Sequence, residues 1–166
     1  IQLLERESIP ELVKGNEKIE KEPSHIHREI SDFIFANEEK ALAIQGPPGT
    51  GKTMLAAAIA KSEEFGIAAT IAIVDAGGHM VVLERMDGGR FHTVHSSTTK
   101  AVTAASNKRP TTTRGAQGQD LDTLHAIGLS LAAGANRWTA MEGGFPIIVD
   151  GECLGGIGVS GGDWQQ

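Results

Sequence analysis

The sequence predicts an α/β domain of helices and antiparallel hairpins, with a helical extension in front of it. Three observations support this prediction. The 166 residues are 40% apolar, which is enough for one ordinary domain with a core. Two pairs of β-rich runs are each joined by a short loop containing glycine, which is typical of hairpins. Only one of the 21 glycines precedes residue 41, so the composition changes there.

The first segment is charged and prone to form a helix. Ser24 follows Pro23 and is placed to cap a helix whose apolar residues recur at helical spacing. Those residues are Ile26, Ile30, Phe33 and Ile34. We therefore expect residues 1–45 to form a helical extension, with a strand-like run at 41–45, and residues 54–166 to form the main domain.

The main domain is predicted to contain three helices and two hairpins. Residues 54–65 have the spacing of an amphipathic helix that ends at Gly66. Residues 70–74 and 80–83 flank a loop with two glycines and predict a hairpin. Residues 93–108, rich in alanine, serine and threonine, predict a helix that ends before Pro110.

The remaining elements complete the main domain. Asp120 is placed to cap a short helix through His125 and Leu129. Residues 146–149 and 153–159 then form a second predicted hairpin that turns at 150–151, where the Asp-Gly pair favours a tight turn.

Charge and cysteine content exclude several functional classes. The net charge of −6 argues against general binding to nucleic acid or to anionic membranes. Cys153 is the only cysteine, so an internal disulfide and a thiolate zinc cage are excluded. The apolar runs, among them 71–74 and 146–149, are far too short to span a membrane. No leader pattern opens the sequence, which favours the cytoplasm, although an isoleucine at position 1 is compatible with a removed leader.

Residues 46–53 match the full phosphate-loop pattern and resemble the beginning of P-loop NTPases and helicases. In that pattern, backbone N–H groups surround a phosphate, lysine neutralises it and threonine binds magnesium. This alternative function is ATP or GTP binding with Mg²⁺, through Gly46, Gly49, Gly51, Lys52 and Thr53. However, a nucleotide domain needs parallel strands joined by crossover helices, whereas this chain turns straight back at residues 77–78. We therefore favour another function.

Residues 54–166 resemble the GlcG/HbpS family, which includes the C-terminal domain of PduO-type proteins. The matching runs include IAIVDAGGH at 71–79, LERMDG at 83–88, GGFPI at 143–147 and GGIGVSGG at 155–162. The resemblance implies a central antiparallel sheet with helices packed against it, assembly into homo-oligomers, and binding of a small ligand. Heme is the best-known ligand, with accessory or sensing roles. Family members usually continue into a final helix, which we expect the domain at 54–166 to lack.

Candidate ligand-binding residues come from this family-like region. Heme needs an apolar slot, an axial donor and a basic partner for its propionates. His79 offers an imidazole in the first hairpin turn, Lys100 an ammonium group and Arg109 a guanidinium that can bind a carboxylate through two hydrogen bonds. The loop at 142–145 allows close backbone approach to a ligand. Its candidate residues are Glu142, Gly143, Gly144 and Phe145.

Each candidate also has a structural interpretation. An exposed loop histidine such as His79 is more often merely solvated, whereas Lys100 is equally well explained as a surface charge, and the 142–145 loop as a tight turn into the last hairpin. His92 and His95 are three residues apart, so they share a helix face if the helix begins by residue 92, and they are candidate metal ligands. We find no convincing nucleophilic triad and assign no catalytic residue. The preferred hypothesis is an oligomeric domain that binds heme or another small ligand. A nucleotide-binding protein and a purely structural assembly module are the alternatives.

Overall fold

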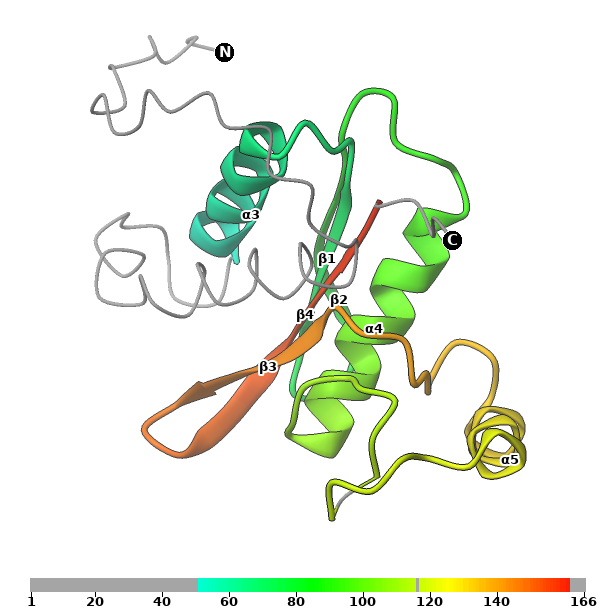
Figure 1. Ribbon diagram of the computed structural model, residues 1–166. Helices are drawn as coiled ribbons and strands as arrows, with labels where there is room; N and C mark the ends of the chain where they lie inside the picture. The colour runs from blue at the N-terminus through cyan, green and yellow to red at the C-terminus, as the bar shows by residue number, and fades with distance from the viewer. Residues whose placement is uncertain (1–50, 116, 162–166) are drawn as a thin grey trace, which may run out of the picture.

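The computed structural model describes residues 51–161 with the exception of residue 116 (Figure 1). The predicted N-terminal helix and the strand-like run at 41–45 lie outside these residues. The elements follow in the order α3 (Lys52–Glu64), β1 (Thr70–Asp75), β2 (Met80–Arg85), α4 (Thr93–Asn107), α5 (Thr123–Ala133), β3 (Gly144–Val149) and β4 (Glu152–Ser160). Both hairpins and all three helices of the described region were expected from the sequence.

The strands form one sheet in the order β2-β1-β4-β3, and every neighbouring pair is antiparallel. β1 pairs with β4, which joins the two hairpins into a single sheet, with Thr70 opposite Ser160 and Asp75 opposite Gly155. The predicted fold class, an α/β domain with a central antiparallel sheet and packed helices, is therefore confirmed.

α3 and α4 cover opposite faces of the sheet (Figure 1). Successive side chains of a strand point to opposite faces, so Ile71 and Ile73 pack with α3, whereas Ala72 and Val74 pack with α4. Ile71 is completely buried. Burying an isoleucine of this kind contributes about 1.5–3 kcal/mol to stability.

The α4 face is packed unusually closely because β4 presents glycines to the helix. A Cβ atom on Gly158 would collide with the carbonyl oxygen of Ser97, and one on Gly156 with that of Ala101. Ser97 and Ala101, the α4 residues at these contacts, are themselves small. The glycine-rich strand and the alanine-rich helix are thus two halves of one interface, in which backbone lies against backbone.

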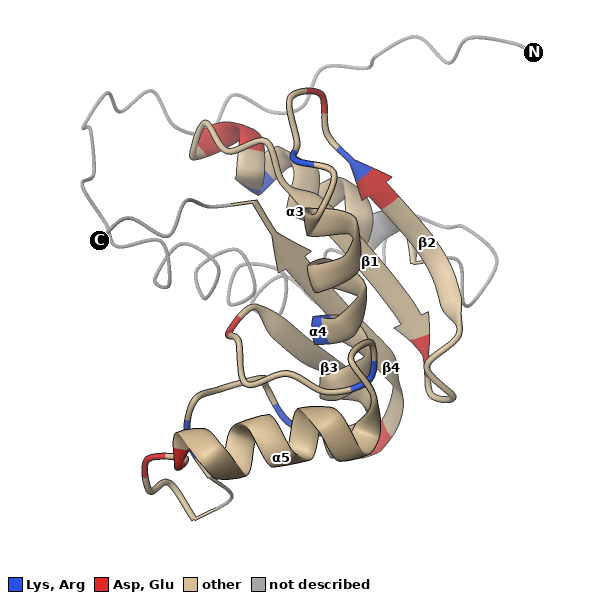
Figure 2. Ribbon diagram, turned by 90° about the vertical axis from the view of Figure 1, so that its right-hand side faces the viewer, with Lys and Arg blue, Asp and Glu red and all other residues tan. Residues whose placement is uncertain are grey.

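α5 lies beyond α4 and away from the sheet (Figure 1, Figure 2). None of its residues is buried, and its range carries no charged residue. Asp122 caps the helix, because its Oδ1 accepts a hydrogen bond of 3.0 Å from the backbone N–H of His125. The expected cap at Asp120 was wrong by two residues. The backbone of Asp120 instead forms an isolated antiparallel β-bridge with that of Arg114.

Candidate functional site

Lys100 is buried rather than a surface charge. It lies on the sheet side of α4, is 4% exposed, and its Nζ donates a hydrogen bond of 3.0 Å to the carbonyl oxygen of Val159. Burial lowers the pKa of Lys100 to about 8, and the negative charge of Glu142 opposes part of this shift. The structure therefore places Lys100 near Glu142 and Gly144, two of the four loop residues proposed from the sequence.

The two glycines of this loop, Gly143 and Gly144, have structural roles. Gly143 has φ of 107°, which side-chain-bearing residues rarely adopt, and its carbonyl oxygen accepts a hydrogen bond from the Val159 N–H. Gly144 donates its N–H to Thr111 Oγ1 at 2.8 Å, and a Cβ there would collide with the carbonyl oxygen of Lys100. The tight-turn interpretation thus accounts for both glycines. Phe145 packs with the core on the α3 face, across the sheet from Lys100.

A cavity of about 740 Å³ lies at the C-terminal end of α4, bounded by the following loop, α5 and residues 138–139. Arg109 lines this cavity and is half-buried. Thr111 lines it too, and through its hydrogen bonds to Gly144 it connects the cavity wall to the Lys100 neighbourhood. Lys100 and the 142–145 loop are not part of the lining.

Three further lining residues were not identified from the sequence: Arg114, His125 and Trp138. His125 and Leu129 both line the cavity from α5, four residues apart on one helix face. That spacing was the available signal. Arg114 and Trp138 lie in irregular segments, where no periodicity indicates which way a side chain points.

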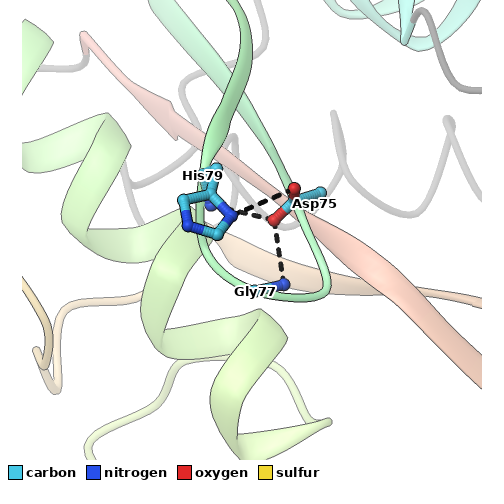
Figure 3. Close-up of polar contacts among 3 residues, drawn as sticks. All are labelled: Asp75, Gly77 and His79. Atoms are coloured by element: carbon cyan, nitrogen blue, oxygen red, sulfur yellow. Dashed lines mark hydrogen bonds and ion pairs between the residues drawn. The ribbon is translucent and has the colours of Figure 1, made fainter.

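His79 is held by a carboxylate (Figure 3). Its Nδ1 lies 3.2 Å from Asp75 Oδ2, while Asp75 Oδ1 accepts the N–H groups of His79 and Gly77 at 2.9 and 2.8 Å. These hydrogen bonds, with that from the His79 backbone as the largest contribution, hold the pKa of Asp75 below its usual value. The His79 side chain is 83% exposed, and its Nε2 has no hydrogen-bond partner among the described residues.

His79 and the cavity lie on different sides of α4. The β1–β2 turn lies near Val102, since a Cβ added at Gly78 would be 3.6 Å from the Val102 side chain, whereas the cavity is lined by Thr103 and Asn107. The structure therefore does not bring His79 together with Arg109 in one site.

His92 and His95 lie at the start of α4, at the opposite end from the cavity. Both are exposed, and the ring of His92 meets Phe91 edge-on at 5.8 Å. Within residues 51–161, apart from 116, no group of three or more histidine, cysteine, aspartate or glutamate side chains is placed to hold a metal ion. Metal binding by this pair stays a prediction.

Only residues 51–53 of the phosphate-loop motif lie within the described part of the structure. Gly46 and Gly49 lie outside the described residues, while Lys52 and Thr53 begin α3. Gly51 precedes the helix, and a Cβ there would lie 3.1 Å from Ile73 Cδ1, so this end of α3 abuts the sheet. The described strands that follow pair only in antiparallel fashion. These features give the nucleotide alternative no support.

Comparisons with known proteins agree with the fold. Residues 50–166 match a family model described as "Haem degrading protein HbpS-like". Protein GlcG of Escherichia coli K12 is 32% identical over 107 residues, which cover 64% of this chain and 75% of GlcG. A 15.0 kDa protein from the dhaT–dhaS intergenic region of Citrobacter freundii is 30% identical over 115 residues, covering 69% and 79%.

Solved structures share the fold at lower identity. ORFY of Klebsiella pneumoniae superimposes with a TM-score of 0.52 at 24% identity, covering 92% of this chain and 86% of ORFY. A double mutant of Streptomyces reticuli HbpS superimposes with a TM-score of 0.51 at 21% identity, covering 94% of this chain and 86% of HbpS. A PduOC–heme complex superimposes with a TM-score of 0.50 at 20% identity, covering 84% of this chain and 81% of PduOC. No helix in the described part of this chain is long and apolar enough to cross a membrane.

Proposed function

This chain belongs to the HbpS-like family, and we propose that it binds heme, or an organic ligand of similar size, in the cavity between α4 and α5. The lining of that cavity has the chemistry that heme requires. Leu121, Leu129 and Trp138 offer apolar walls, Arg109 a basic partner for a propionate, and His125 an axial donor.

The relatives support heme as the ligand. The family is described as haem degrading, and one structure with this fold was solved as a heme complex. Binding of heme suits an accessory or sensing role. The described residues contain no arrangement to which we assign a catalytic step.

His79 is the second candidate for the axial ligand. A histidine that binds a metal commonly donates its other ring N–H to a carboxylate, which fixes the orientation of the ring. Asp75 makes such a contact with Nδ1 of His79. This geometry leaves Nε2 to bind iron at the molecular surface, where a second protein copy can cover the heme.

We also propose that the protein is a homo-oligomer with α5 in its interface. Leu124 and Leu131 are 79% and 78% exposed. Exposed apolar residues concentrated on one helix mark an interaction surface. A second copy that buried them would remove this surface from water.

A hemin titration of the full chain tests the proposal. We expect a saturable Soret shift at micromolar hemin, lost in His125→Ala and retained in His79→Ala and in the double variant of His92 and His95. Loss in His79→Ala alone would move the site to the β1–β2 turn. Absence of any shift in the wild-type protein would refute heme binding.

A further inference from the structure

Arg109 is a half-buried cation that lines the cavity and has no hydrogen-bond or ion-pair partner within the described part of the chain. A guanidinium carries five N–H donors in a planar fork. Donors that are removed from water without a partner cost free energy. An acceptor from a ligand would satisfy them.

The surroundings of Arg109 favour an oxygen acceptor. Thr111 Oγ1 accepts the Gly144 N–H, and Thr112 Oγ1 accepts the Arg114 N–H at 3.2 Å. The Thr112 hydroxyl donates to no described residue. It is thus a second available donor in the wall that contains Arg109.

The charge balance of the wall limits how many negative charges the ligand carries. Arg109 and Arg114 are positive, whereas Asp120 and Asp122 are negative, so these four charges cancel. Asp122 already accepts the His125 N–H through Oδ1. A balanced wall suits an isolated carboxylate and disfavours a polyphosphate, which needs an excess of positive charge.

We propose that Arg109 binds a carboxylate of the ligand, so that this cavity selects flat, apolar organic acids over their neutral analogues. The planar guanidinium matches a carboxylate through two parallel hydrogen bonds. Trp138 and Leu129 receive the apolar part of the ligand. The inference rests on the proposed function for the place of the site, but it requires no iron coordination.

A pair of metal-free probes tests the inference: protoporphyrin IX, with free propionates, and its dimethyl ester. Binding of each to the full chain is followed by porphyrin fluorescence in the same detergent-containing buffer. We expect the wild-type protein to bind the acid at least tenfold more tightly than the ester. Arg109→Gln should remove this preference, and Arg109→Lys should retain part of it, because lysine keeps the charge but loses the bidentate geometry.

Arg137→Gln is the matched control. Arg137 is exposed and near the cavity but does not line it. Its variant should keep the full preference for the acid, and a thermal melt of each variant confirms that it is folded. The inference is overturned if Arg109→Gln keeps the preference, or if the wild-type protein binds neither probe or both equally. A hemin Soret shift that persists in that case leaves heme binding in place, so failure of the two proposals is distinguishable.

Discussion

α4 and α5 differ in how far the apolar character of their residues agrees with their burial. α4 is built mainly from small or polar residues, yet eight of its residues are buried, including Lys100. α5 carries three leucines and an isoleucine, yet buries none of its residues. The partner surface explains the difference: α4 faces glycines of β4, while α5 has no extensive contact with another helix or strand among the described residues. Burial therefore follows from the fit between two surfaces, and the apolarity of a helix alone does not determine it.

The substitution with the largest expected effect on stability is Gly158→Ala, because it disrupts the packing of α4 on β4. The added Cβ would collide with the Ser97 carbonyl oxygen and lie 2.7 Å from the Ala101 nitrogen, both of which belong to the backbone. Because backbone atoms cannot rotate away, we expect a loss of about 3 kcal/mol or more in the free energy of unfolding. Urea denaturation followed by circular dichroism measures it. A loss below about 1 kcal/mol would show that α4 and β4 are less closely packed than described.

The second prediction concerns the buried charge on α4. The pKa of Lys100 falls from its ordinary 10.5 to about 8 in the folded protein. Between these pH values the unfolded chain binds more protons, so stability should rise as pH increases from about 8 to 10.5 and stay free of this dependence below 8. The full change is about 3 kcal/mol.

Lys100→Met should remove this rise, whereas Lys52→Met, at an exposed lysine, should retain it. Urea midpoints for the three proteins at pH 7 and pH 10.5 provide the measurement. An identical pH response in the wild-type protein and Lys100→Met would contradict the buried position of the ammonium group.

On α5, a substitution should affect assembly more than folding. Leu124→Ser and Leu131→Ser change exposed side chains, so each should alter the free energy of unfolding by about 0.5 kcal/mol or less at low protein concentration. Together they should lower the oligomeric mass measured by light scattering during size-exclusion chromatography. An unchanged mass would exclude α5 from the proposed interface.

The remaining prediction is a small gain in stability from Gly128→Ala, the counterpart on α5 of Gly158→Ala on β4. A Cβ at Gly128 meets no atom within 4 Å. Alanine in a helix interior is favoured over glycine by about 0.5–1 kcal/mol, and we expect a gain of that size. Thermal melts of both glycine variants measure the contrast, and equal losses would contradict it.

Local pattern was sufficient to predict the elements of the described region. The loops at 76–79 and 150–151 indicated both hairpins, and the composition of residues 93–108 indicated α4. The burial of Lys100 was not predictable in this way, because it depends on strand β4, nearly sixty residues later. Close approach of the helix to Gly144 and Gly158 encloses that side chain, and periodicity within α4 carries no information about either glycine.

The candidate site was less accessible to sequence reasoning. Arg109 was identified as a carboxylate-binding residue, and the structure places it in the cavity wall. Its neighbours were missed because they come from segments between residues 103 and 139 that have no common motif. The contact between His79 and Asp75 was missed for another reason: it spans a turn, where helical or strand spacing does not apply.

Paramagnetic NMR can locate the ligand that we propose to lie between α4 and α5. Ferric heme broadens the amide signals of nearby residues, so a ¹⁵N-labelled sample titrated with hemin maps the site without any substitution. We predict that Thr111, His125 and Trp138 lose intensity first, while Gly78 and His95 keep theirs. Broadening centred on the β1–β2 turn or on the start of α4, with the cavity signals unchanged, would contradict the account.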